Sequence, residues 1–306
     1  MLLEVFKALA DNTRLRITHI LLTHELSVNE LVQILEMGQS RISRHLKILS
    51  EAGILQFRRD GLWVFYSTPA SGRMHDFLES TLRFLPITEE LQSDLDKTAK
   101  KLEERHLKTR MFFNNIAEKW DALNHEILGK FDLAAKVCSV LPEKCITAVD
   151  LGCGTGEVLE KLLDKSERVI GVDGSAQMLQ MCHNRLSGID EKKLSLRIGD
   201  LSHLPLADQE ADFACLNLVL HHLHCPESIF HEIRRILSPN GYLFLTDFTR
   251  HSDETMRLNY GDHWLGLDPA RVENNLKANG FEIKNTILQP VNHNLSLFMI
   301  EAAKAH

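Results

Sequence analysis

One glycine-rich stretch constrains the possible folds of this chain more than any other feature. Residues 146–163 read ITAVDLGCGTGEVLEKLL, an apolar run followed by three alternate glycines and the start of a helical pattern. A strand, a glycine corner and a helix in this order let backbone N–H groups approach a bound ligand closely. The pattern predicts an α/β fold, a Rossmann-like doubly wound sheet whose ligand lies at the carboxyl ends of the strands.

The spacing of the glycines indicates the kind of ligand. Gly152, Gly154 and Gly156 form G-x-G-x-G, which lacks the last glycine of the dinucleotide-binding fingerprint. Asp150 lies just before this corner, where its charge would repel a pyrophosphate and attract a cationic amino-acid group. We therefore expect a ligand with a positive end.

Three further segments place polar residues at the ends of apolar strands. Asp173 ends the run RVIGVD, and we expect it to bind both hydroxyls of a ribose. Asp200 and Leu201 follow the strand LSLRI and are expected to bracket an adenine, with the carboxylate accepting from the exocyclic amine. Asn217 ends the apolar strand ADFACLN. Four such strand ends predict one binding crevice.

Together with RRILSPNGYLFLTDF, this series resembles the class I S-adenosylmethionine-dependent methyltransferases of the small-molecule, UbiE-like (type 11) kind, over about residues 110–306. The resemblance implies a seven-stranded domain, S-adenosylmethionine or S-adenosylhomocysteine as cofactor, and a small-molecule methyl acceptor. It places Asp150, Gly152 and Gly154 beside the methionine part. The full predicted set of cofactor contacts is Asp150, Gly152, Cys153, Gly154, Gly156, Asp173, Gly174, Asp200, Leu201 and Asn217.

The first part of the chain has a different pattern. The segment LLEVFKALADNTRLRITHILL predicts two helices, because its apolar rhythm breaks at capping residues near Asp11. In LSVNELVQILEM, Ser27 and Glu30 have the spacing of a capping box. After Gly38 comes QSRISRHLKILSEAGI, with apolar residues on one side and polar, cationic ones on the other. This order predicts a helix-turn-helix with a cationic second helix.

The segment that follows predicts a β-hairpin, because β-rich residues flank Asp60-Gly61 in GILQFRRDGLWVFYS. A hairpin directly after a recognition helix is a wing, so we expect a winged helix that binds double-stranded DNA in the major groove. Residues 1–86 hold 10 Lys and Arg against 9 Asp and Glu, whereas the rest holds 25 against 33. The predicted DNA contacts are Gln39, Ser40, Arg41, Ser43, Arg44, Lys47, Arg58 and Arg59.

The segments FKALADNTRLRI and ELSVNELVQILEMGQSRISRHLKILSEAGIL resemble the ArsR/SmtB family of winged-helix repressors, over about residues 1–85. The resemblance implies operator binding as a homodimer. Many members sense metals through a cysteine pair in ELCVCDL, but this chain has Ser27 and Asn29 at those positions. The second metal site of the family needs several ligands on the last helix, where His75 is the single histidine. We expect no metal site.

A chain of 306 residues is expected to hold two domains. The predicted limits are 1–85 for the winged helix, 86–110 for a charged, solvent-exposed helical connector and 111–306 for the methyltransferase domain. The apolar runs are too short to span a bilayer and a secretory signal is missing, so we expect no membrane partner and a cytoplasmic location. The scattered cysteines argue against a disulfide framework.

The residues that would catalyse methyl transfer stay unassigned, because the reaction needs little beyond alignment of the acceptor and, for some acceptors, a base. Candidates for a base or a metal ligand are His221, His222, His224, Asp247, His251, Tyr260, Asp262 and His263. The motifs of DNA base methylation are missing: NLVL replaces the Asn/Asp-Pro-Pro-aromatic tetrad, and Cys225-Pro226 reverses the Pro-Cys of cytosine enzymes.

Three hypotheses follow for the whole chain. It is a transcriptional regulator that also methylates a small molecule, or a regulator whose methyltransferase-like domain only senses S-adenosylmethionine or S-adenosylhomocysteine, or an enzyme that uses the winged helix as a dimerisation scaffold. The cations Arg41, Arg44, Lys47 and Arg58 argue against the third.

Overall fold

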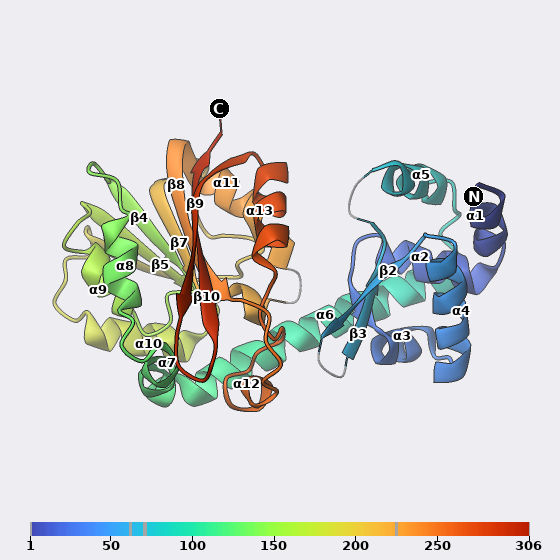
Figure 1. Ribbon diagram of the computed structural model, residues 1–306, viewed down its shortest axis with the longest axis horizontal. Coiled ribbons are helices and arrows are strands. Elements are labelled where there is room, and N and C mark those ends of the chain that lie inside the picture. Colours follow the sequence, from blue (N-terminus) through green and yellow to red (C-terminus); the bar gives the residue numbers. More distant parts are fainter. Residues whose placement is uncertain (1, 61–62, 70–71, 224–225, 306) are drawn as a thin grey trace. The chain divides into compact units, whose positions relative to one another are not determined.

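The computed structural model describes residues 2–60, 63–69, 72–223 and 226–305, which divide into two compact units at 107/108 (Figure 1). Gly61, His224 and Cys225, named in the sequence analysis, lie outside these residues. Among the described helices, none combines the length and the apolar composition that a membrane span requires. The division falls within one long helix, and the predicted domain limits at 85/86 and 110/111 stay a prediction.

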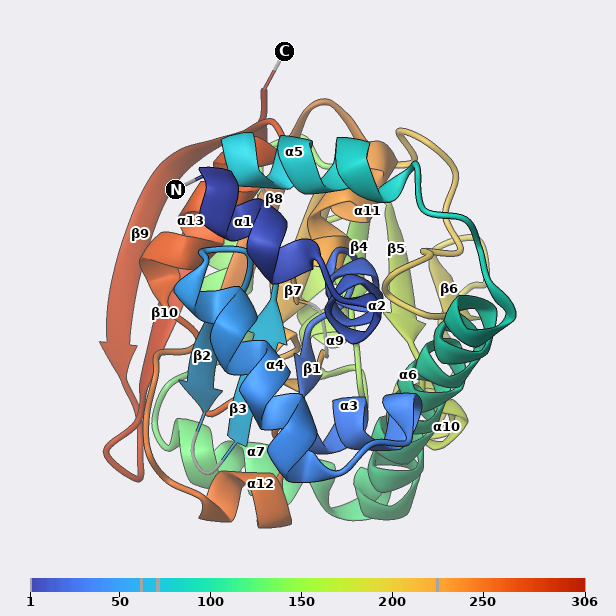
Figure 2. The ribbon, with the colours of Figure 1, turned by 90° about the vertical axis from the view of Figure 1, so that its right-hand side faces the viewer.

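Unit 1 is a group of helices with a small antiparallel sheet of order β1-β3-β2 (Figure 2). Its elements are α1 (Leu2–Leu9), α2 (Asn12–Leu21), β1 (Leu26–Ser27), α3 (Val28–Leu35), α4 (Gln39–Glu51), β2 (Gln56–Asp60), β3 (Trp63–Ser67), α5 (Arg73–Leu82) and most of α6 (Glu89–Ile116). Helices α3 and α4 form the predicted helix-turn-helix, and β2 pairs with β3 directly after it.

Local capping explains where the helices of unit 1 begin. The Asp11 side chain accepts a hydrogen bond from the Arg14 N–H and starts α2, as predicted from the break in the apolar rhythm. Ser27 and Glu30 form the predicted capping box at the start of α3. The apolar faces then meet in one core, which includes Ile17, Leu31 and Leu46.

The expectation of a solvent-exposed connector is wrong for the part of α6 within unit 1. The Arg16 guanidinium forms two hydrogen bonds, of 2.6 and 2.8 Å, with the buried carboxylate of Asp94. Arg105 forms an ion pair with Glu30, and this pairing lowers the pKa of Glu30 although burial acts in the opposite direction. The charged pattern of this segment therefore includes ion-paired buried residues, which a count of charges does not distinguish from solvated ones.

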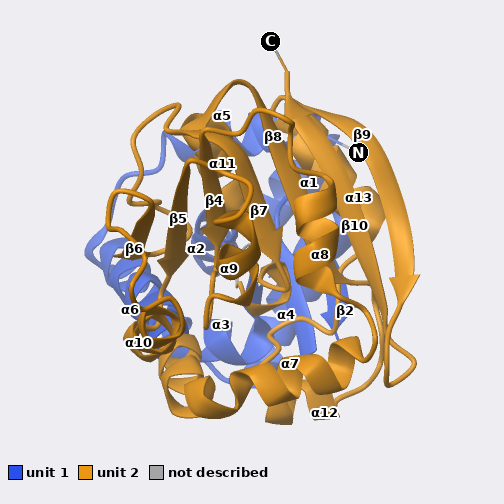
Figure 3. Ribbon diagram, turned by 90° about the vertical axis from the view of Figure 1, so that its left-hand side faces the viewer, with its two compact units in different colours: residues 1–107 blue, residues 108–306 orange. Residues whose placement is uncertain are grey.

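Unit 2 is built around a seven-stranded sheet (Figure 3). After the end of α6 come the 3-10 helix η1 (Ala117–Lys119), α7 (Trp120–Leu128), α8 (Leu133–Ser139), β4 (Thr147–Leu151), α9 (Glu157–Leu162), β5 (Arg168–Asp173), α10 (Ala176–Arg185), β6 (Leu194–Ile198) and β7 (Ala211–Asn217). Then follow η2 (Leu220–His222), η3 (Pro226–Ser228), α11 (Ile229–Ile236), β8 (Leu237–Phe248), α12 (Thr255–Asn259), α13 (Pro269–Ala278), β9 (Phe281–Pro290) and β10 (Ser296–Lys304).

The strand order is β6-β5-β4-β7-β8-β10-β9, with β10 antiparallel to both of its neighbours. Strands β4, β5, β6, β7 and β8 pair in parallel with their neighbours among these five, so their carboxyl ends share one edge of the sheet. Along the chain the strands progress outward from β4 through β5 to β6, and then restart on the other side at β7. The order reverses between β4 and β7, where ligands of doubly wound sheets bind. The predicted Rossmann-like, doubly wound seven-stranded fold is confirmed.

Two hydrophobic cores cover the two faces of the sheet. One packs α7–α10 against the sheet through residues such as Val137, Leu159 and Cys182. The other packs α11 and α13 against the opposite face through Phe230, Ile233 and Leu276. Because both faces of β4 are covered, all five of its residues are buried. This explains why apolar residues do not alternate with polar ones on either side of Asp150.

Candidate functional site

The end of β4 and the glycine corner form one tight structure. Gly152 has a φ of +75°, and its N–H donates to the Val172 carbonyl on β5 at 2.7 Å. A Cβ at this position would clash with the Val219 Cγ2 atom, so a larger residue would have to displace the Val219 side chain. Gly154 (φ +52°) and Gly156 (φ +89°) also adopt left-handed conformations, and Gly156 leads directly into α9.

Asp173 at the end of β5 is tied to the same corner. Its carboxylate accepts N–H bonds from Gly154 at 2.9 Å and from Ser175 at 2.8 Å. Burial raises the pKa of Asp173, while these N–H bonds act in the opposite direction. Asp173, the residue predicted to bind the ribose, thus also holds the glycine corner in place. Each of its carboxylate oxygens can accept a second hydrogen bond.

Asp150 is a buried carboxyl group, only 3% exposed. Burial raises its pKa to about 7, and the nearby charge of Asp173 acts in the same direction. Its carboxylate accepts a hydrogen bond from the Cys215 thiol at 3.2 Å, a weak donor, and no described cation forms an ion pair with it. The thiol and the neighbouring Asn217 amide both act to lower its pKa. An acid held this way is suited to a cationic ligand, which would compensate its charge.

The elevated pKa of Asp150 predicts a pH-dependent effect of Asp150→Asn on stability. A carboxyl group whose pKa is higher in the folded state stabilises the fold while protonated, and this contribution is lost as the pH rises from about 4 to the folded pKa of about 7. The variant without ligand should match the wild type near pH 4 and exceed its free energy of unfolding by about 2–4 kcal/mol at pH 8.

Urea unfolding across this pH range measures the difference. Asp164→Asn is the matched control, because Asp164 is exposed in the same unit and its replacement should leave stability unchanged at every pH. A variant that is less stable than the wild type at pH 8 would contradict the account of a buried, uncompensated charge.

The remaining predicted contacts follow β6 and β7. Asp200 is exposed and its carboxylate accepts from both the N–H and the hydroxyl of Ser202, whereas Leu201 is buried beside it. Asn217 ends β7, and its buried side-chain amide lies close enough to Asp150 to lower the pKa of that carboxyl group, but it forms no well-aligned hydrogen bond with any described residue. An amide in this state is adapted to a ligand that supplies the missing partners.

The segment before β4 contributes residues that the sequence analysis did not assign. The Asn114 side-chain oxygen accepts from the Ser175 hydroxyl at 2.6 Å and so joins the end of α6 to the end of β5. Trp120 lies beside Gly154, and the Phe113 ring lies 5.4 Å from the Trp120 ring, centroid to centroid. No signal in the sequence distinguishes Asn114, because a polar residue in a charged helix is ordinary.

The structure brings together four of the candidate bases and ligands: His221, His222, Asp247 and Asp262. Burial alone would lower the pKa of His221, but the neighbouring carboxylates Asp247 and Asp262 raise it overall. Burial and the charge of His221 together lower the pKa of His222 well below its ordinary value. His251, Tyr260 and His263 lie outside this cluster; the His263 N–H nevertheless donates to the His221 carbonyl.

On unit 1, α4 presents the predicted DNA-binding residues to solvent. Gln39, Ser40, Arg41, Ser43, Arg44 and Lys47 are all exposed, while Ile42, Leu46 and Leu49 anchor the helix in the core. Arg41 and Arg44 form no ion pair within the described part of the chain, and Lys47 has only an exposed pairing with Glu51. This face is therefore available to phosphates and base edges.

The two hairpin arginines differ from one another. Arg59 is exposed, as a phosphate contact requires. Arg58 is paired with the Glu25 carboxylate through two hydrogen bonds and with Asp60 through a third, all between 3.0 and 3.2 Å, and stacks over the Phe65 ring. Its charge is thus compensated inside unit 1, which the sequence did not indicate, and a DNA contact by Arg58 stays a prediction.

Ser27, at one of the positions where metal-sensing ArsR proteins carry a cysteine, has a structural role here. Its hydroxyl donates to the Glu30 carboxylate at 2.8 Å and accepts the Glu30 N–H at 3.4 Å. The position is therefore used to cap α3, in agreement with the absence of the thiolate pair.

Comparison with known proteins bears on both units. Residues 11–56 match the family described as "Bacterial regulatory protein, arsR family", and residues 149–245 match the family described as "Methyltransferase domain". Over 63 residues the chain is 56% identical to the arsenic resistance transcriptional regulator ArsR1 of Pseudomonas putida, covering 20% of this chain and 49% of that protein. Over 140 residues it is 31% identical to a demethylmenaquinone methyltransferase of Thermobifida fusca, covering 45% of this chain and 59% of the relative.

The chain thus spans about half the length of the curated relatives it matches. A solved structure of a SAM-dependent methyltransferase from Aquifex aeolicus has a TM-score of 0.50 at 19% identity and covers 63% of this chain and 98% of that one. This likeness concerns the fold, since fold alone does not determine activity. Residues 11–56 therefore form an ArsR-family helix-turn-helix, and residues 149–245 belong to a methyltransferase domain with a Rossmann-like fold.

Proposed function

We propose that this protein is a DNA-binding transcriptional regulator whose second unit binds S-adenosylmethionine and methylates a small molecule. The observation that carries the cofactor proposal is the succession of polar residues at the carboxyl ends of four neighbouring parallel strands, β6, β5, β4 and β7. These residues surround the point where the strand order reverses. Their carboxylate and amide groups can pair with the cationic and hydrogen-bonding groups of the cofactor.

The residues present fit the cofactor. Asn217 offers a buried amide that forms no well-aligned hydrogen bond with any described residue, and Asp150 offers a buried carboxylate that no described cation compensates. When bound, S-adenosylmethionine would supply an electrophilic methyl group beside a positively charged sulfur. In this proposal Asp150 receives the amino-acid end, Asp173 accepts hydrogen bonds from the ribose hydroxyls, and Asp200 and Leu201 hold the adenine.

The proposed partners of unit 1 are operator DNA and a second copy of this chain. The exposed cations of α4 support contacts to the major groove, and Arg59 of the hairpin supports a contact to the flanking backbone. Among the exposed large apolar side chains of this unit, five lie on α1 or between α5 and α6, and a second copy would cover them: Leu2, Leu3, Phe6, Phe84 and Ile87. The Phe6 ring of α1 contacts Phe77 of α5, so these helices present adjoining apolar surface.

A second candidate function is sensing without catalysis. The observation that favours it is the burial of the candidate bases, because His221, His222, Asp247 and Asp262 are each at most 6% exposed. A base enclosed in this way cannot take a proton from an acceptor until the surrounding loop moves. In that case S-adenosylmethionine or S-adenosylhomocysteine would bias operator binding, which requires a different affinity for the DNA-binding and non-binding states.

One experiment tests the proposal and separates the candidates. Duplexes selected from a random pool by the protein itself are titrated with the apo protein, with S-adenosylmethionine and with S-adenosylhomocysteine. Methyl transfer is followed in parallel by mass spectrometry of a metabolite extract with isotopically labelled cofactor. Labelled products support catalysis, and cofactor-dependent DNA affinity without product supports sensing. Absence of cofactor binding would contradict both.

A further inference from the structure

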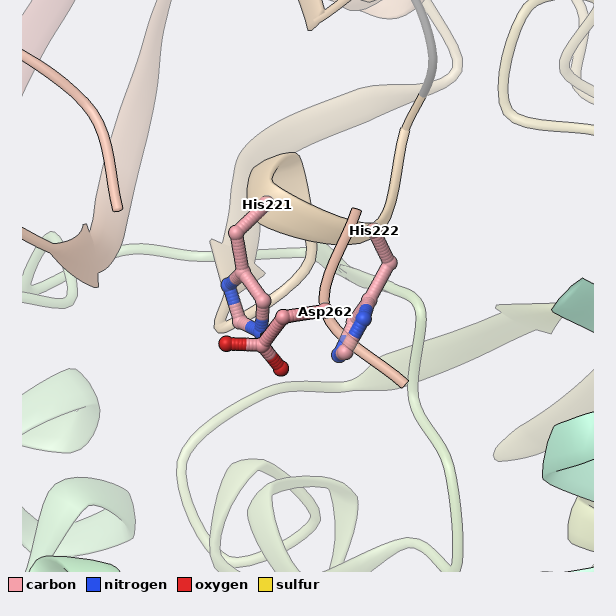
Figure 4. Close-up of side chains that lie close together, drawn as sticks. All are labelled: His221, His222 and Asp262. Carbon is pink, nitrogen blue, oxygen red and sulfur yellow. The ribbon is translucent and has the colours of Figure 1, made fainter. Parts of the chain in front are cut away.

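The cluster of His221, His222, Asp247 and Asp262 has an arrangement that neither the fold nor cofactor binding requires. His221 and His222 lie in η2, directly after β7, and Asp247 lies near the end of β8. Asp262 follows α12 on a loop that is fastened to η2, because the His221 carbonyl accepts the N–H groups of both His263 and Trp264 at 2.9 Å. Figure 4 shows the His221 and His222 rings on two sides of the Asp262 carboxylate.

The hydrogen bonds of the two histidines determine which ring nitrogens remain available. The His221 Nδ1 lies 2.7 Å from a carboxylate oxygen of Asp247, and the His222 Nδ1 lies 3.3 Å from the Gly261 carbonyl. Both partners are acceptors, so each Nδ1 donates its hydrogen, which leaves both Nε2 atoms on the side of Asp262. A carboxylate or carbonyl behind the distal ring nitrogen is the usual support of a metal-binding histidine.

Three ligand atoms then converge on one place. The His221 Nε2 lies 3.6 Å from the Asp262 Oδ1, and one ligand atom from each of His221, His222 and Asp262 lies within 4.8 Å of the others. The His222 Nε2 and both Asp262 carboxylate oxygens are buried and form no hydrogen bond with any described residue. Ligands about 2.0–2.2 Å from a tetrahedral ion are roughly 3.4 Å apart, close to the first of these spacings.

The backbone holds the carboxylate at this position. Gly261 has a φ of +76°, and a Cβ there would lie 2.5 Å from the Phe112 Cε1 atom. The chain therefore passes tightly against the end of α6 and presents Asp262 toward the histidines. A conformation that buries two imidazoles beside one carboxylate, with the His222 Nε2 and both carboxylate oxygens left without a hydrogen bond to any described residue, needs a reason in the chemistry of the site.

We propose that His221, His222 and Asp262 bind a divalent transition-metal ion of the Zn²⁺ class, with Asp247 as the positioning residue behind His221. Two imidazoles and one carboxylate suit zinc and its neighbours better than Ca²⁺ or Mg²⁺, which prefer oxygen ligands. Three protein ligands leave one coordination position open, as in catalytic zinc sites. This inference goes beyond the proposed function and does not depend on it, because it concerns ion binding by the protein without cofactor.

No metal site was predicted from the sequence. His221, His222 and Asp262 were named only among several candidates for a base or a metal ligand, because the sequence does not show that η2 meets a loop forty residues later in the chain. Asp262 is brought to the two histidines by the tertiary fold.

The test is metal binding by the full-length chain after treatment with a chelator. Co²⁺ is titrated at about pH 8, where ligand nitrogens are deprotonated, and followed by its visible absorption; Zn²⁺ is titrated by calorimetry. We expect one equivalent of each ion per chain. His222→Gln and Asp262→Asn should each weaken binding by at least about 100-fold, and Asp247→Asn by about 10–100-fold with the stoichiometry retained.

His231→Gln is the matched control, because His231 is an exposed histidine of the same unit and its replacement should leave binding unchanged. Circular dichroism establishes that each variant is folded. If either His222→Gln or Asp262→Asn fails to fold, the remaining variant and the metal stoichiometry of the wild type still test the proposal. A wild-type protein that takes up neither ion, or a folded His222→Gln or Asp262→Asn variant that binds as tightly as the wild type, would overturn the proposal.

Discussion

Asp173→Ala should weaken binding of S-adenosylhomocysteine by at least about 100-fold and leave the affinity of the apo protein for DNA unchanged. In the proposed complex the Asp173 carboxylate accepts two hydrogen bonds from the ribose, and charge-assisted bonds of this kind contribute about 1.5–3 kcal/mol each. The same substitution removes the support of the Gly154 and Ser175 N–H groups, which adds to the loss. Calorimetry measures the cofactor affinity, and fluorescence anisotropy measures DNA binding.

Two controls make this result interpretable. Asp164→Ala removes an exposed carboxylate from the same unit and should leave cofactor affinity at the wild-type value. Asp173→Asn retains one acceptor oxygen for the glycine corner but loses the charge, so its affinity should lie between those of the wild type and Asp173→Ala. If Asp173→Ala binds the cofactor as tightly as the wild type, the assignment of the ribose contact is wrong.

Arg44→Glu should reduce affinity for the selected duplex by at least about 100-fold and leave cofactor affinity unchanged. Arg44 is exposed on α4, and in the proposed complex its reversal replaces an attraction to phosphates by a repulsion, twice in the proposed dimer. The slope of log affinity against log salt concentration should also fall, because fewer counterions are released when a phosphate contact is lost. Anisotropy titrations at several salt concentrations provide both quantities.

Lys100→Glu is the control for net charge. Lys100 is exposed on α6 and is not among the predicted DNA contacts, and its reversal changes the total charge by the same amount. Lys100→Glu should change the affinity for the selected duplex far less than Arg44→Glu does. Equal effects of the two variants would show that bulk charge governs binding and would remove the proposed role of α4.

The regular parts of the fold were predictable because each depends on local chemistry. The glycine corner predicted the turn between β4 and α9, since left-handed backbone at Gly152 and Gly156 excludes larger residues. The Ser27–Glu30 spacing predicted the start of α3, since the side chains satisfy the free N–H groups of the first turn. Alternation of apolar strands and helices predicted the doubly wound sheet.

The parts that the sequence did not reveal depend on partners distant in the chain. Arg58 has the spacing of a wing residue, yet Glu25, thirty-three positions earlier, compensates its charge. Asp94 is one acid among many in α6, yet Arg16 makes it a buried ion-pair partner. Neither contact follows from periodicity, because helical and strand patterns report which side of an element is apolar and not which charges meet across the core.

The same limit applies to the candidate site. Asp150, Asp173 and Asn217 were predictable because parallel strands bring their ends to one edge. The hydrogen bond from the Cys215 thiol to Asp150 was not, because it joins neighbouring strands whose register the sequence does not specify. Asp262 was named as a candidate, but its approach to His221 depends on the loop conformation around Gly261.

The most direct test of the central claim is a crystal structure of the protein with S-adenosylhomocysteine at saturating concentration. We predict density for the nucleoside at the carboxyl ends of β4, β5, β6 and β7, with the Asp173 carboxylate within hydrogen-bond distance of both ribose hydroxyls. Density for the nucleoside elsewhere, or its absence at this edge of the sheet, would contradict the account.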